Sequence, residues 1–207
     1  MKTYPFSGLF FMLFFPAIQS FAGWYDAGFH PRVEMEYVIT LSSAMETALK
    51  WYDPEFEIWS PRDFHPMVRG LYEYKSFEPW RDFLAYQTPS AVIGDFNGDE
   101  VPDAVLMGHN KTQGKTIAII SKEGKYTLVE INSGPLKNPL APEYARGDNN
   151  IEDYMELVPP GKIKAEPAYN RPELDLKTDA FKTVVFEKCG SIHIYKDGKF
   201  EDYALSD

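Results

Sequence analysis

The chain has 207 residues, with 31 acidic and 21 basic side chains and a formal net charge of −10. This acidic balance disfavours nucleic acid and anionic lipid surfaces as partners, and it favours metal ions or a cationic protein. The single cysteine, Cys189, allows no internal disulfide bond, so packing must supply most of the stability of the fold.

Residues 1–22 have the pattern of a cleaved secretory signal. Lys2 precedes an apolar run over residues 8–18, and small residues lead up to a cleavage point after Ala22. An uncleaved membrane anchor is the weaker alternative, because the run is short and contains a proline. Cleavage would remove one basic and no acidic residue and leave a single predicted domain, residues 23–207, with a net charge of −11. We therefore expect a periplasmic or secreted protein without stable membrane insertion.

Two helices are predicted in residues 36–74. Apolar side chains recur at three- and four-residue steps over residues 36–52, which indicates an amphipathic helix, and Pro54 should end it. The second helix is expected to be shorter, with Ser60 and Asp63 as capping candidates ahead of an apolar stripe.

From about residue 90 onward the apolar pattern changes to period two, which is typical of strands. The expected strands are residues 91–94, 104–108, 116–121, 126–131, 154–158, 181–187, 191–196 and 200–204. Gly124 and Gly198 stand where tight hairpin turns require glycine, whereas residues 133–153 and 161–178 read as surface loops. The predicted fold class is α+β, with two N-terminal helices packed on an antiparallel β-meander that occupies residues 90–207.

The stretch GDFNGDEVPDAVLMG, residues 94–108, joins the first two expected strands. Five positions of its tight loop can offer oxygen ligands, four from side chains and one from a backbone carbonyl: Asp95, Asn97, Asp99, Asp103 and Val101. Oxygen ligands at alternate positions are how a chain surrounds a hard cation such as calcium. Three carboxylates this close also repel one another unless a cation compensates them. We therefore predict one calcium site, and the alternative is a hairpin turn that happens to be acidic.

The same loop resembles the calcium loop of the FG-GAP or VCBS-type repeat of integrin-alpha-like β-propellers, whose usual pattern is D-x-[DN]-G-D-G-x-x-D-[LA]. The matching residues are Asp95, Asn97, Gly98, Asp99 and Asp103. Glu100 stands where that family usually has glycine, so a residue with a Cβ must adopt a positive φ at a cost of about 1 kcal/mol. Leu106 occupies the place of the closing glutamate of an EF-hand, which excludes that motif. Only one copy is present, so the resemblance implies the ion loop and not a full propeller.

Other chemical patterns are weak. The four histidines, His30, His65, His109 and His193, do not have zinc-ligand spacing. Cys189 has no assured general base, although His193 follows four residues later. Aromatic residues of the first half can form a sugar-stacking or protein-binding face, but such residues more often seal the contact between helices and sheet: Trp24, Tyr25, Trp51, Tyr52, Trp59 and Trp80.

Three functions stay open on the sequence. The first is an exported non-catalytic protein whose calcium loop rigidifies a β-hairpin and so shapes a binding surface. The second is a periplasmic inhibitor or immunity-type protein that occludes a basic enzyme, which the acidic charge and the export signal favour. The third is a hydrolase with an unrecognised active site, so no catalytic residue is assigned and an enzyme is the less favoured class.

Overall fold

The structure is a computed structural model that describes residues 38–68, 70, 87–136, 151–164, 173–186 and 188–206. All of them belong to one compact unit, Met35–Asp207. The predicted signal sequence, residues 1–22, lies outside the described residues, and so do His30, Trp24, Tyr25 and Trp80. Of the described residues, 55% are in strands and 13% in helices, so the α+β prediction is wrong and the fold is mostly β.

The first predicted helix is present but shorter than residues 36–52. It is α2 (Ser43–Tyr52), and it begins where it does because the Ser42 side chain accepts a hydrogen bond from the Met45 N–H at 3.2 Å. Val38, which the apolar spacing had assigned to the helix, lies ahead of this cap and is exposed. The helix ends at Asp53, as the proline at position 54 predicts. No helix in the described part of the chain is long and apolar enough to cross a membrane.

Where the second helix was predicted, the described residues hold the short 3-10 helix η1 and then α-helical residues at 66–68 and 70. Ser60 and Asp63, the two capping candidates, bond to each other across the 3-10 helix η1 (Pro61–Asp63), where the Ser60 N–H donates to Asp63 Oδ2 at 2.8 Å. Phe64 then forms a parallel bridge with Ile151 instead of continuing as helix. A further helical turn covers residues 66–68 and reaches residue 70, and residues 71–86 lie outside the described part. The cap pair therefore begins η1, and the chain becomes extended again at Phe64.

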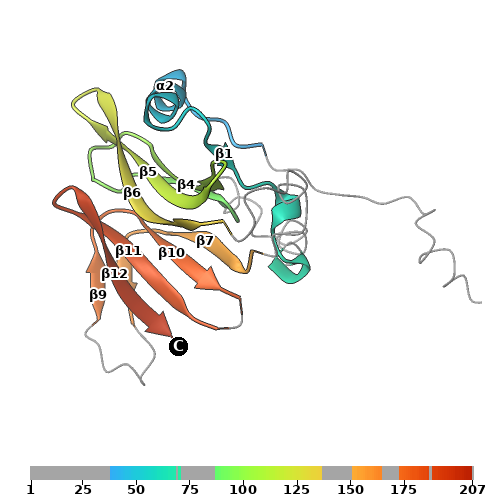
Figure 1. Cartoon of the computed structure of the whole chain (residues 1–207). Coiled ribbons are helices and arrows are strands. Elements are labelled where there is room, and N and C mark those ends of the chain that lie inside the picture. Colours follow the sequence, from blue (N-terminus) through green and yellow to red (C-terminus); the bar gives the residue numbers. More distant parts are fainter. Residues whose placement is uncertain are drawn as a thin grey trace, which may run out of the picture. The chain divides into compact units, whose positions relative to one another are not determined.

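The strands form two antiparallel sheets and a separate ribbon, not one meander (Figure 1). The first sheet has the order β2-β3-β4-β5-β6, with β1 pairing β4 beyond the end of β3: β1 (Glu57–Ile58), β2 (Gln87–Thr88), β3 (Ala91–Gly94), β4 (Asp103–His109), β5 (Gln113–Lys122) and β6 (Lys125–Pro135). The second sheet has the order β12-β11-β10-β7: β7 (Asp153–Val158), β10 (Ala180–Val185), β11 (Gly190–Lys196) and β12 (Lys199–Ser206). The ribbon pairs β8 (Gly161–Ile163) with β9 (Leu174–Leu176), so the predicted loop over residues 161–178 is partly strand.

Each predicted strand has a counterpart, and the two predicted hairpin turns are confirmed. Glu123 and Gly124 both have positive φ, and so do Asp197 and Gly198, which is the backbone of a type I′ turn. These turns join β5 to β6 and β11 to β12.

Three apolar clusters hold the two sheets, α2 and the β8–β9 ribbon together. The largest lies between the two sheets and includes Val105 and Met107 of β4 with Met155 and Phe181 of the second sheet. A second cluster places Met45 of α2 against the opposite face of the first sheet. A third lies between the second sheet and the β8–β9 ribbon. Since the first sheet is covered on both faces, β4 is buried along nearly its whole length, which explains its continuous apolar run.

Candidate metal centre

The five predicted ligands lie in the connection between β3 and β4 and at the first residue of β4. These strands pair as far as Gly94 and Asp103, so the intervening residues form a closed loop at one end of the first sheet. Gly98 and Glu100 have φ values of 78° and 64°. The positive φ predicted for Glu100 is thus confirmed, and Gly98 also has the positive φ of a sharp bend.

Asp95 organises the turn of this loop through backbone hydrogen bonds. Its Oδ1 accepts from the N–H groups of Gly98 at 2.7 Å and Asp99 at 3.1 Å, and its Oδ2 accepts from the Glu100 N–H at 2.9 Å. The side chain therefore holds three consecutive amides around one carboxylate.

Asn97 and Asp99 connect the loop to β5 through Ser121. Asn97 Nδ2 donates to the Ser121 carbonyl at 2.6 Å, and the Ser121 hydroxyl donates to Asp99 Oδ2. Asp99 Oδ1 also accepts from the Val101 N–H at 2.9 Å. The hydrogen bond from Ser121 lowers the pKa of Asp99, so this exposed carboxylate stays ionised. Val101, the predicted carbonyl ligand, is exposed at the tip of the loop.

Asp103 is fully buried at the base of the loop. Its two carboxylate oxygens accept from the backbone N–H groups of Phe96, at 3.0 Å, and Ser121, at 2.6 Å. Burial raises the pKa of Asp103, and these hydrogen bonds oppose the rise. Of the five predicted ligands, Asp103 is therefore the one whose side chain is wholly engaged in holding the backbone at the base of the loop.

The loop also contacts the second sheet through Thr178 and Asp179, which precede β10 and which sequence reasoning missed. The Asp95 N–H donates to Asp179 Oδ2 at 2.8 Å, and the Asp179 N–H donates to the Asp95 carbonyl at 3.1 Å. A Cβ added to Gly98 would lie 2.9 Å from Thr178 Cγ2, so the close approach requires glycine there. No local pattern marked Ser121 or Asp179. Ser121 lies 18 residues after Asp103 and reaches the loop through the pairing of β4 with β5. Asp179 lies 84 residues after Asp95 and reaches the loop from the second sheet, which packs on the first.

The donor set of the loop fits a hard cation, although its side chains do not surround one point. Four carboxylates gather here, and among the described residues none of them forms an ion pair with a lysine, an arginine or a histidine: Asp95, Asp99, Asp103 and Asp179. Within the same described ranges, no group of three or more His, Cys, Asp or Glu side chains is placed to hold a metal ion. Each carboxylate oxygen has two lone pairs, so one that accepts an N–H can still coordinate a cation.

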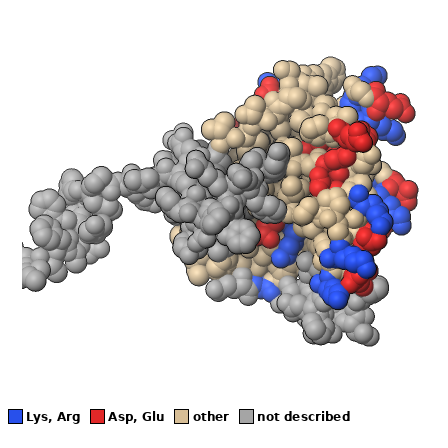
Figure 2. Space-filling view, turned by 180° about the vertical axis from the view of Figure 1, so that it is seen from behind, with Lys and Arg blue, Asp and Glu red and all other residues tan. Residues whose placement is uncertain are grey.

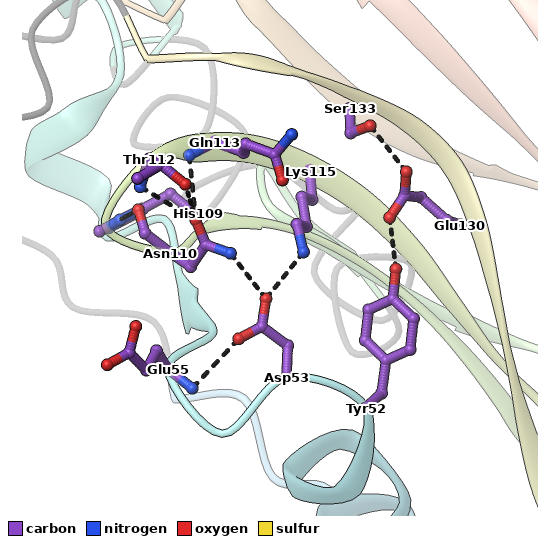
Figure 3. Close-up of polar contacts among 10 residues, drawn as sticks. All are labelled: Tyr52, Asp53, Glu55, His109, Asn110, Thr112, Gln113, Lys115, Glu130 and Ser133. Carbon is purple, nitrogen blue, oxygen red and sulfur yellow. Dashed lines mark hydrogen bonds and ion pairs between the residues drawn. The ribbon is translucent and has the colours of Figure 1, made fainter.

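A second polar cluster joins the end of α2 to β5 and β6 (Figure 3). Lys115 donates to Asp53 Oδ2 at 2.8 Å, and the side chains of this pair are each only 10% exposed. Asn110 Nδ2 donates to the same oxygen at 2.8 Å, and the Tyr52 hydroxyl donates to Glu130. Burial and the carboxylate of Glu130 raise the pKa of Tyr52 to about 12. Because each polar group in this cluster already has a partner, it is a structural joint and not a candidate site.

The structure also describes several other residues that the sequence singled out: His193, Cys189, Trp59 and Trp51. His193 Nδ1 bonds to Asp202 Oδ1 at 2.7 Å and His193 Nε2 bonds to Thr183 Oγ1 at 2.8 Å, so neither ring nitrogen serves Cys189 as a base. Cys189 itself is free and exposed. Trp59 is buried and stacks on His109 with ring centroids 4.0 Å apart, as expected of an aromatic that seals a junction. Trp51, in contrast, is 87% exposed on α2.

No protein-family model matches the chain, and comparisons with curated proteins and with solved structures found no similar protein.

Proposed function

We propose that the protein is an exported, non-catalytic binding protein in which the loop of residues 94–108 binds one calcium ion. The observation that carries this proposal is the gathering of four carboxylates without a basic partner among the described residues. Like charges a few ångströms apart cost free energy unless an opposite charge lies between them, and a doubly charged ion supplies it.

Three residues would hold the ion through side chains at the open end of the loop, namely Asp95, Asn97 and Asp99. Val101 would add its carbonyl, and Asp103 would add charge from its buried position. The chemistry supplied by the ion is charge neutralisation and rigidity. Since the loop is bonded to Ser121 of the first sheet and to Asp179 of the second, fixing it would stabilise the contact between the two sheets.

Thermal unfolding in calcium and in chelator tests the proposal. An ion that binds the folded state alone stabilises it by about 2.7 kcal/mol at a hundred times its dissociation constant, which corresponds to about 5–10 °C for a domain of this size. Asp99→Ala should remove that difference, whereas Asp175→Ala removes an equal charge outside the loop and should preserve it. Magnesium should replace calcium poorly, because it demands a smaller and more rigid octahedral shell.

Calorimetric titration of chelator-treated protein gives the direct measurement. One calcium ion per chain, lost in Asp99→Ala and kept in Asp175→Ala, is the expected result. If the wild-type protein takes up no calcium at millimolar concentration, the loop is an acidic turn and the proposal is wrong.

A cationic partner protein is the second candidate, because exposed side chains at the loop tip, Asp99, Glu100 and Val101, can meet a basic surface as well as an ion. Figure 2 shows acidic and basic side chains interspersed on the face in view, so that face offers no extended patch of one sign. The test is a pull-down from the native envelope fraction. This candidate would be favoured over a purely calcium-stabilised module if the wild-type protein captures and inhibits a single basic enzyme and Asp99→Ala fails to capture it.

A further inference from the structure

Asn97 and Gly98 form the one Asn–Gly pair of the 207-residue chain. In such a pair the second residue has no side chain to hinder the approach of its backbone nitrogen to the side-chain carbonyl carbon of asparagine. The structure places the pair at the turn of the β3–β4 loop, with Asn97 half-buried and Gly98 exposed.

We propose that Asn97 is a site of spontaneous covalent modification, deamidation through a cyclic imide with Gly98, and that the folded loop holds this reaction in check. The Gly98 nitrogen would lose its proton to solvent base and attack Asn97 Cγ, forming a new C–N bond. The Cγ–Nδ2 bond then breaks, and the amide leaves as ammonia. Water opens the imide at one of its two carbonyls and leaves aspartate or isoaspartate. The reaction needs no oxidant and no co-reactant besides water.

The contacts of the folded loop restrain each reacting group. Asn97 Nδ2 donates to the Ser121 carbonyl at 2.6 Å, to Ser121 Oγ at 3.3 Å and to Asp99 Oδ2 at 3.2 Å. Asn97 Oδ1 accepts from the Asp99 N–H at 3.0 Å, and the Gly98 N–H donates to Asp95 Oδ1 at 2.7 Å. The side chain is thus fixed at both ends, and the two carboxylates oppose the negative charge that develops on the attacking nitrogen. The reaction should therefore proceed from a locally opened loop.

The products would weaken the link between the loop and β5. The side chain of an aspartate at position 97 has no N–H to donate to Ser121, and it adds a carboxylate between Asp95 and Asp99 in the loop. Isoaspartate adds a methylene group to the backbone and shifts every later residue of the loop. Neither consequence requires that the loop bind calcium, so this inference is independent of the proposed function.

The rate of deamidation in the whole protein provides the test. Wild-type protein is incubated at neutral pH and body temperature, with chelator in every sample, and peptides that contain residue 97 are assayed for aspartate and isoaspartate by mass spectrometry. The same protein in urea gives the unrestrained rate. Ser121→Ala removes the hydroxyl contacts with Asn97 and Asp99 and keeps the Ser121 carbonyl, which accepts from Asn97. Asn132, which precedes Ser133 in β6, serves as an internal control far from the loop contacts.

We expect folded wild-type protein to deamidate at position 97 about tenfold or more slowly than in urea, since a loop that opens rarely exposes the reacting groups rarely. Ser121→Ala should raise the folded-state rate several-fold or more, because it removes two hydrogen bonds of the loop, without changing the rate at Asn132. Equal rates in the folded and the urea-unfolded wild type would overturn the proposal, and that comparison decides it even if Ser121→Ala does not fold. A folded Ser121→Ala protein with an unchanged rate would equally show that these contacts are not the restraint.

Discussion

Replacing Asp53 by alanine should destabilise the protein far more than replacing the neighbouring Glu55. Asp53 accepts hydrogen bonds from Lys115 Nζ and Asn110 Nδ2, both at 2.8 Å, and from the Glu55 N–H at 3.2 Å. The Asp53 and Lys115 side chains are each 10% exposed, so Asp53→Ala leaves a nearly buried ammonium group without the carboxylate to which it is bonded. Breaking such a pair costs about 3–5 kcal/mol, a large part of the 5–15 kcal/mol stability that is typical of a domain.

Glu55→Ala is the matched control. Glu55 pairs with Lys111 on the surface, where the two side chains are 52% and 76% exposed, and pairs of that kind contribute about 1 kcal/mol or less. Both variants remove one negative charge within three positions of each other, so they differ chiefly in burial. Lys115→Met in the Asp53→Ala background should recover part of the loss, because no unpaired buried charge is then left.

Urea unfolding at neutral pH compares the wild type, the two single variants and the double variant. The shift of the urea midpoint reports the change in unfolding free energy, provided that the slope of that free energy against urea concentration is unchanged. Burial by itself would raise the pKa of Asp53, but the hydrogen bonds from Lys115, Asn110 and the Glu55 N–H outweigh it and lower the pKa. The contribution of Asp53 is therefore present above the ordinary pKa of 3.8 and is lost as the pH falls through the lower folded-state pKa. If Asp53→Ala and Glu55→Ala shift the midpoint equally at neutral pH, the Asp53–Lys115 pair is solvated and this reasoning fails.

Three further outcomes are expected. Burial lowers the pKa of His193 below 6.5, so the contribution of His193 to stability is present above that pH and is lost as the pH falls through the folded-state pKa. In a pH series of thermal melts, His193→Gln should therefore weaken the fall of the melting temperature with falling pH. An unchanged fall would contradict this expectation. Cys189→Ser should leave folding and any binding activity nearly intact because the thiol is exposed, and loss of an activity in a folded Cys189→Ser protein would instead point to covalent chemistry. N-terminal sequencing of the exported protein should begin at Gly23, whereas a full-length membrane-bound product would refute cleavage after Ala22.

Local sequence determined the strands, their turns and the position of the loop between β3 and β4. Strand β3 was predicted to the residue, and the turns at Gly124 and Gly198 followed from the need for positive φ. These features depend on neighbours within a few positions, which is why a short window suffices to predict them. The end of α2 before Pro54 is of the same kind.

The tertiary structure decided how the strands divide and what surrounds the loop. Period-two patterning does not state which strand pairs with which, so a single meander and two packed sheets have the same sequence signature. The sequence also did not show that the first sheet is covered on both faces, by the second sheet on one and by α2 on the other. Ser121 reaches the loop through strand pairing within the first sheet, and Asp179 reaches it through the packing of the second sheet on the first. Such tertiary contacts leave no mark in the residues beside them.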